Sequence, residues 1–302
     1  MDHPIDYIAR THAWYGALGY APYRYAQFAD VPFAPLGRKL AGARVALLTT
    51  AAPYRPELGD QGPGAAYNAA AKFYAVWSAE AGGDFDLRVS HVAVDQAHLS
   101  DDQNCWFPLA ALRRAADAGR IGEVGPRVHG VPTNRSQRHT LEVDAPEVLT
   151  RLREDGADAA LLVANCPVCH QSMTLVARAL EAAGVATVVV GAARDIVEHV
   201  GASRFLFSDL PLGNAAGLPH DPASQDLVAE MALSLLEDAV APRTTVQTPL
   251  AWPVAGWKAD YMNLAALTPA EIARRRAQNE AARETAASLR AATSPSPSAA
   301  GA

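Results

Sequence analysis

The chain has 302 residues, which is enough to bury the core of one large α/β domain or of two small ones. Half of the residues are hydrophobic and the net charge is −6, so no overall positive field favours nucleic acid or an anionic membrane as a partner. Three cysteines are too few for a disulfide scaffold. No apolar run approaches the roughly 18 residues of a membrane-spanning helix, and the N-terminus does not resemble a secretory signal, so we expect a cytoplasmic protein. In that compartment the thiols are expected to serve in catalysis, metal binding or redox chemistry.

Residues 1–42 are rich in aromatic side chains among Pro and Gly, and they predict an arm that packs on the main body or on a second subunit. A buried strand is predicted over residues 44–50, where an apolar run lies between Gly42 and Pro53. The pattern then indicates a helix over 65–81, a strand over 86–95, and helices over 107–119 and 147–155.

The clearest unit of the chain spans residues 158–190. Two short apolar runs, 158–164 and 186–190, enclose a periodic helix over 171–183 that ends at Gly184. Buried strands joined by a helix favour parallel pairing with a right-handed crossover. The alternation of helix and strand continues after this unit. The pattern indicates a helix over 193–200, a strand over 204–207 and a helix over 223–239.

These elements predict an α/β fold: a Rossmann-like, doubly wound, mainly parallel sheet with helices on both faces. Residues 1–42 form the predicted arm, and residues 43–265 form the α/β catalytic region, which could divide into two lobes near 145. Thr268 and Glu271 form a capping box that opens a charged helix within 266–293. Residues 294–302 have the composition of a disordered tail.

The segment from Asn165 to His170 is the strongest functional candidate. It joins a buried strand to the first turn of a helix, where unpaired backbone N–H groups favour negative charge. A thiolate at that position has a lowered pKa, and the Cys166-x-x-Cys169 spacing allows a dithiol–disulfide cycle or two ligands to one soft metal. The alternative is a buried structural cysteine pair.

A second group of polar residues lies between residues 90 and 105. His91 could act as a base or a ligand, with Asp95 or Asp102 orienting it, and Cys105 supplies a third sulfur. Asp and Asn also favour turns and helix caps, which is the simpler explanation for the carboxylates.

The remaining candidates are predicted to bind substrate. Gly213 and Asn214 lie in a strand-to-helix loop where glycine permits close backbone approach to a ligand. Thr50 ends the first strand at the same edge of the sheet. Arg135 and Arg138 could hold a substrate carboxylate through paired hydrogen bonds.

Four segments together resemble the component B family of glycine, sarcosine, betaine and D-proline reductases. They read RVALLTTAAPY, SHVAVDQAHLSDDQNCWFPLAALRRAADAGRIG, NCPVCHQSMTLVARALEAAGVATVVV and RFLFSDLPLGNAAGLPHDPASQ, in the family's order. The resemblance implies a Rossmann-type fold and reductive C–N cleavage, in which a selenolate or thiolate attacks the α-carbon of an activated amino acid. Cys166 and Cys169 correspond to the thiol centre, whereas the family's upstream selenocysteine is replaced by Val163.

Three hypotheses follow. In the first, Cys166 or Cys169 attacks a small carboxylate-bearing, amino-acid-derived compound and breaks a C–N or C–S bond, while His91 or His170 moves protons. In the second, Cys105, Cys166 and Cys169 hold Zn²⁺ or a [4Fe–4S] cluster, and the protein is a desulfurase or desulfhydrase acting on a thioxo substrate. In the third, the chain is a non-catalytic redox subunit. A second subunit or a homodimer is expected as partner.

Overall fold

The computed structural model of the chain describes residues 3–53, 57, 74–89, 91, 93–133 and 135–293. Within these residues the centre is an eight-stranded sheet with the order β10-β9-β8-β7-β1-β6-β3, and β5 pairs with β1. All neighbouring strands are parallel except β3, which runs antiparallel to β6. The strands are β1 Arg44–Thr49, β3 Trp77–Glu80, β5 Glu123–Val124, β6 Arg127–Gly130, β7 Ala159–Val163, β8 Ala186–Gly191, β9 Arg204–Phe207 and β10 Thr244–Gln247. A separate short ladder joins β2 Ala52–Pro53 to β4 Leu87–Arg88.

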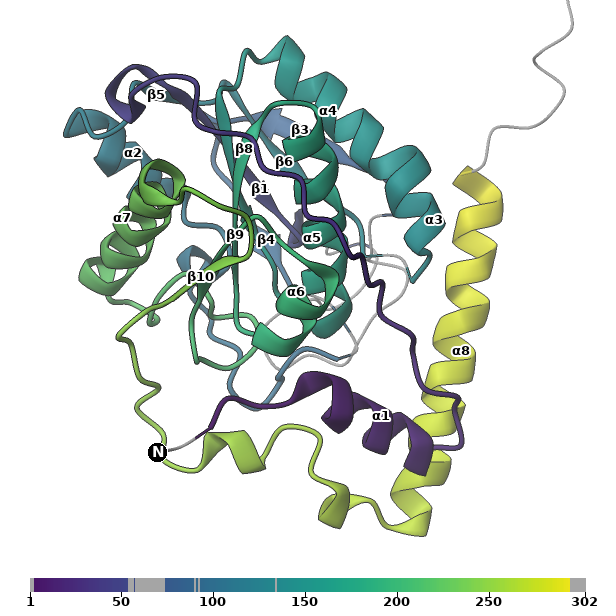
Figure 1. Ribbon diagram of the computed structural model, residues 1–302. Helices are drawn as coiled ribbons and strands as arrows, with labels where there is room; N and C mark the ends of the chain where they lie inside the picture. Colours follow the sequence, from purple (N-terminus) through teal and green to yellow (C-terminus); the bar gives the residue numbers. More distant parts are fainter. Residues whose placement is uncertain are drawn as a thin grey trace, which may run out of the picture.

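Helices cover both faces of the sheet (Figure 1). They are α1 Tyr7–Ala17, α2 Leu109–Asp117, α3 Gln137–His139, α4 Ala145–Glu154, α5 Pro167–Ala182, α6 Arg194–Val200, α7 Pro222–Asp238 and α8 Pro269–Thr293, and a π-helical turn, Thr140–Asp144, joins α3 to α4. No helix in the described part of the chain combines the length and the apolar character needed to cross a bilayer.

Two apolar layers hold the helices to the sheet, because successive strand residues point to opposite faces. In β1, Val45 and Leu47 belong to the layer that contains Leu112 of α2 and Val228 of α7. The alternate residues of β1 belong to the layer that contains Val148 of α4 and Met173 of α5. The predicted α/β class, with mostly parallel strands and helices around the sheet, is confirmed.

The order of the strands reverses at β1. From β7 the chain proceeds outward through β8, β9 and β10 on one side, while β6 and β3 lie on the other. The carboxyl ends of β1 and β7 therefore form a switch point, the place where open parallel sheets bind their ligands. The pairing of β1 with β7 also joins residues from both sides of position 145 in one sheet.

Several predicted boundaries differ from the structure. The helix predicted over 65–81 is wrong at its end, since Trp77–Glu80 is strand β3, and its residues 65–73 lie outside the described residues. The strand predicted over 86–95 is reduced to Leu87–Arg88. Helix α5 begins at Pro167 rather than at 171, because Cys166 caps it and proline is well suited to the first turn.

The N-terminal arm packs against the main body and the C-terminal helix. Helix α1 lies beside α6 and crosses α8 (Figure 1). On α8, the Arg275 guanidinium stacks over the Trp14 ring, with 5.0 Å from its central carbon to the ring centre, and Arg283 covers Tyr20 at 4.8 Å. The arm and the C-terminal helix thus stabilise each other within one chain.

Candidate active site

The Cys166–Cys169 loop begins helix α5 at the end of β7. Cys166 has extended backbone and is the N-cap of α5, and its Sγ accepts a hydrogen bond from the Cys169 backbone N–H at 3.2 Å. The two cysteines are paired as a disulfide, with 4.8 Å between their Cα atoms. A reduced Cys166 thiolate at this position would accept a backbone hydrogen bond and would also be stabilised by the positive end of the helix dipole.

His91 lies beside the cysteine pair. One ring nitrogen of His91 and the two Sγ atoms all lie within 4.8 Å of one another, and all three residues are buried. The Nε2–H group of His91 donates to the Thr50 carbonyl at 3.0 Å, which fixes the ring at the end of β1. The structure thus brings three of the predicted site residues together at the switch point.

Thr50 and Asn165 connect the ends of β1 and β7. Thr50 Oγ1 accepts hydrogen bonds from the Asn165 backbone N–H at 3.2 Å and from Asn165 Nδ2 at 3.0 Å. Asn165 is fully buried, yet its Oδ1 has no hydrogen-bond partner in the described part of the chain. An unsatisfied buried acceptor is costly to a fold, so this oxygen beside the cysteine loop is a candidate acceptor for a bound ligand.

Thr133 is a site residue that the sequence did not reveal. Its Oγ1 lies 3.2 Å from Cys169 Sγ, within hydrogen-bond distance. It follows β6 in a Val-Pro-Thr segment with no recognisable motif, so only the tertiary structure shows its proximity to the thiol.

His170 is held by backbone groups rather than exposed to a substrate. Its Nε2 accepts from the Ala192 N–H at 2.8 Å and from the Ala193 N–H at 3.1 Å, so the ring proton is on Nδ1, which donates to the Cys166 carbonyl at 2.7 Å. Burial lowers the pKa of His170 to about 4. Both nitrogens are engaged and the ring stays neutral near pH 7, so His91 is the better of the two predicted proton carriers.

The cysteine pair is less accessible than expected for a reactive site. The residue exposures are 3% for Cys166, 0% for Cys169 and 7% for His91. Polar groups of Thr50, His91 and Thr133 contact this site, but a substrate reaches the buried thiols only if covering residues move.

Cys105 lies outside the group formed by His91 and the other two cysteines. It packs in the apolar layer that contains α2 and α7, whereas Cys166 and Cys169 pack in the layer that contains α4 and α5. Burial raises the pKa of the Cys105 thiol to about 12, and its Sγ donates to Ser100 Oγ at 3.7 Å. In place of the predicted set of three cysteines, the structure assembles two cysteines and one histidine.

The predicted substrate-binding loop has structural contacts. The amide of Asn214 is fully buried: Nδ2 donates to the His98 carbonyl at 2.9 Å, and Oδ1 accepts from the Ser100 N–H at 3.2 Å. Gly213 has a φ of +96°, and a Cβ there would lie 2.4 Å from Leu99. These two residues therefore fasten one loop to another.

The two predicted carboxylate-binding arginines lie at the surface. Arg138 has a side chain that is 83% exposed and approaches Glu142 at 3.9 Å. The guanidinium of Arg135 covers Tyr15 of the arm at 5.6 Å from the ring centre. Their observed partners are thus a surface glutamate and the N-terminal arm.

The sequence comparisons identify one curated relative of this chain. Over 152 residues it is 32% identical to the D-proline reductase subunit gamma of Acetoanaerobium sticklandii, a match that covers 50% of this chain and 63% of the relative. The two chains are distant relatives. The match confirms the predicted resemblance to the reductase family, although the aligned region spans less than two thirds of the relative's length. No family profile matches the chain, and no solved structure matches it.

Proposed function

We propose that this chain is a reductase-family enzyme that uses Cys166 and Cys169 as a two-electron dithiol. The observation that carries the proposal is the cysteine pair at the N-terminus of α5, with His91 beside it at the switch point of the sheet. The relationship to a D-proline reductase subunit supports an amino-acid-derived substrate. The disulfide of the structure corresponds to the oxidised end of the cycle.

The proposed reaction has two steps, one for each cysteine. In the first, the Cys166 thiolate attacks the substrate α-carbon, an S–C bond forms, the carbon–heteroatom bond breaks, and the leaving amine takes a proton. In the second, the Cys169 thiolate attacks the Cys166 sulfur, the S–C bond breaks, and the released carbon takes a proton. The two cysteines are oxidised to the disulfide, and an external dithiol reduces them for the next cycle.

The surroundings of the two cysteines support a different role for each. Cys166 caps the helix and retains slight exposure, whereas Cys169 is fully buried and contacts Thr133. Cys166 is therefore the nucleophile and Cys169 the resolving thiol. His91 is placed to supply the protons of both steps, because its ring lies against the cysteine pair.

Asn165 supplies a recognition group for the substrate. Its buried Oδ1, which has no partner among the residues that the structure describes, accepts a hydrogen bond from the ammonium or amine of an amino-acid derivative. By analogy with the relative, whose name describes it as a subunit, we also propose that a second protein chain takes part in turnover.

The proposal is tested by turnover of D-proline by the reduced chain with a dithiol, alone and with cell extract as a source of the second chain. Cys166→Ser and Cys169→Ser are expected to lose nearly all product formation, by about 10³-fold or more. Cys105→Ser is the matched control and should retain activity. Unchanged turnover in either variant of the pair would overturn the proposal, and a reversible disulfide without any turnover would favour a redox subunit instead.

A second candidate function rests on the same group. After reduction, one imidazole nitrogen and two thiolates within 4.8 Å form a ligand set that suits Zn²⁺ with an open fourth position. Such a centre would bind substrate sulfur directly, which supports C–S cleavage in a desulfhydrase. A [4Fe–4S] cluster is less well supported, because Cys105 lies outside the group.

Metal analysis separates the two candidates. For the metal-dependent enzyme, the reduced chain should bind one equivalent of zinc, His91→Ala should weaken that binding by about 10-fold or more, and a chelator should abolish activity. Metal-free, fully active protein would exclude it.

A further inference from the structure

A second polar cluster lies where β3 pairs with β6, on the opposite side of β1 from β7. Ser78 of β3 is directly opposite His129 of β6 in this antiparallel pair, so both side chains point to the same face. That face is the one next to α4, and Asp155 is the residue at the C-terminal end of this helix. Three residues far apart in the sequence thus meet at one point.

Hydrogen bonds join these residues in a chain. Asp155 Oδ2 lies 2.9 Å from His129 Nε2, and Ser78 Oγ lies 2.7 Å from His129 Nδ1. Because a carboxylate only accepts, Nε2 carries the ring proton and Nδ1 accepts from the serine hydroxyl. His129 is fully buried and burial lowers its pKa, so the ring is neutral at pH 7 and able to take a proton.

Two arginines organise the cluster. Arg127 Nε donates to Asp155 Oδ1 at 2.7 Å, which holds the carboxylate with its other oxygen toward His129. Arg151 Nη1 donates to Ser78 Oγ at 2.5 Å. A guanidinium at this distance stabilises negative charge that develops on or next to the serine oxygen.

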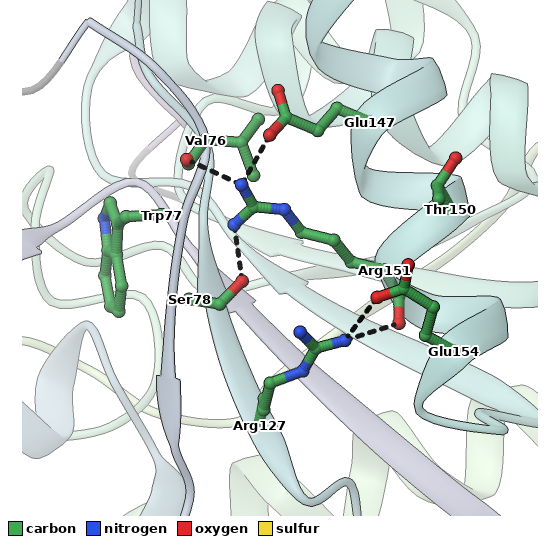
Figure 2. A pocket seen from close by; sticks show the side chains of 8 residues that line it. All are labelled: Val76, Trp77, Ser78, Arg127, Glu147, Thr150, Arg151 and Glu154. Atoms are coloured by element: carbon green, nitrogen blue, oxygen red, sulfur yellow. Dashed lines mark hydrogen bonds and ion pairs between the residues drawn. The ribbon is translucent and has the colours of Figure 1, made fainter.

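Ser78 faces a surface pocket of about 670 Å³ (Figure 2). Arg127 and Arg151 also line it, and Figure 2 shows the Arg151 guanidinium between Ser78 and Glu147. None of the thiol-site residues His91, Cys166 and Cys169 lines this pocket. Ser78 is half-buried, whereas His129 and Asp155 are buried behind it, so a ligand in the pocket would meet the hydroxyl first.

We propose that Ser78, His129 and Asp155 form a second active site that hydrolyses small acyl esters. Ser78 Oγ attacks the ester carbonyl carbon and its proton passes to His129 Nδ1, while the oxyanion faces Arg151. The C–O bond to the leaving group breaks, and the alcohol takes the proton from His129. Water then cleaves the acyl-serine by the reverse transfer, so that ester and water become acid and alcohol.

In the usual serine triad the serine contacts Nε2 of the histidine and the aspartate contacts Nδ1. Here the two nitrogens are exchanged: Ser78 contacts Nδ1 and Asp155 contacts Nε2. Either nitrogen of a neutral imidazole can act as the base when the other donates to a carboxylate. The arrangement is therefore chemically equivalent, and it differs from a purely structural histidine by its half-buried hydroxyl and adjoining pocket.

Labelling of Ser78 by a fluorophosphonate tests the proposal on the full-length, disulfide-bonded chain, in which Cys166 and Cys169 cannot react. Peptide mapping is expected to find the adduct on Ser78, and Ser78→Ala should lower 4-nitrophenyl acetate hydrolysis by about 10²-fold or more. Ser234→Ala is the matched control, because Ser234 bonds to Glu230 on α7. A folded chain without an adduct on Ser78 would overturn the proposal.

A second measurement guards against variants that fail to fold. In the unaltered chain, Ser78 labelling should fall as the pH decreases through the titration of His129, below the ordinary histidine pKa. Labelling that stays constant from pH 8 down to the pH at which the chain unfolds would show that His129 is not the base and would also overturn the proposal.

Discussion

At the scale of single residues, Thr50 has more influence on the site than its small side chain suggests. Its Oγ1 accepts both hydrogen bonds of Asn165 at the end of β7, and its carbonyl accepts from His91. One residue thereby sets the positions of His91, the proposed proton carrier, and of the loop that leads to Cys166. The contacts are fully buried, so each is expensive to lose.

Thr50→Val should therefore destabilise the chain although it preserves the volume. We expect a loss of about 2–4 kcal/mol in the free energy of unfolding, because the two Asn165 donors lose their acceptor. Urea unfolding measures the loss. Thr50→Ser keeps the hydroxyl and should stay within about 1 kcal/mol of the unaltered chain; equal stability of the two variants would contradict this account of the site.

At the scale of elements, His170 connects the start of α5 with the segment between β8 and α6. Its Nδ1–H donates to Cys166, and its Nε2 accepts from Ala192 and Ala193. Protonation of Nε2 would break both of the latter bonds in a fully buried site. The same contacts that position the cysteine loop thus make its support sensitive to acid.

Stability should therefore decrease between pH 6.5 and pH 4. Burial lowers the pKa of His170 to about 4 in the folded chain, below its ordinary value of 6.5, so the unfolded chain binds more protons in this window. The contribution is complete above pH 6.5 and is lost as the pH falls toward 4, by about 3 kcal/mol in total. Denaturant unfolding at several pH values measures it. His170→Gln should flatten the dependence, and a slope as steep as that of the unaltered chain would contradict the assignment.

The predictable elements are those with continuous apolar runs. Strands β7 and β8 and the helix between them were predicted because both faces of these strands are buried and Gly184 ends the helix. Strands β3 and β10 were missed because they are short, half-exposed edge strands. Strand β6 was missed because Arg127 and His129 interrupt the apolar pattern by which a buried strand is recognised in a sequence.

The site was predictable in part for a similar reason. The spacing of Cys166 and Cys169 is visible in the sequence, and His91 stands there as a possible base or ligand; the structure places the three side chains together. The distinction between His91 and His170 depends on backbone N–H groups more than twenty positions away. Whether Cys105 joins the other cysteines depends on which face of the sheet it packs, which a local pattern cannot determine.

At the scale of the whole molecule, a buried ion pair fastens the arm to the sheet. Glu181 of α5 lies 2.9 Å from Arg204 of β9, and both side chains are inaccessible to solvent. Glu181 also accepts from the backbone of Ala34, and Arg204 donates to the Ala34 carbonyl at 2.8 Å. The guanidinium of Arg204 stacks over Phe33 at 4.2 Å from the ring centre. The arm is thus part of the folded core rather than an appendage.

Glu181→Gln should destabilise the chain by about 3–5 kcal/mol, because it leaves the Arg204 charge buried without its partner. Thermal or urea unfolding measures the change. Glu198→Gln removes an exposed partner of Arg194 one turn along α6 and should change stability by no more than about 0.5 kcal/mol. Similar small losses in both variants would show that the buried pair does not hold the arm.

The most direct test of the thiol chemistry uses chloroacetate, a carboxylate whose α-carbon carries a good leaving group and needs no further activation. The reduced Cys169→Ser chain is incubated with it and analysed by intact mass and peptide mapping. The account predicts one carboxymethyl group on Cys166, with Cys105 unmodified, because only Cys166 is both helix-capping and free of a resolving thiol. Modification of Cys105 first, or a Cys166 that stays unmodified in the folded chain, would contradict it.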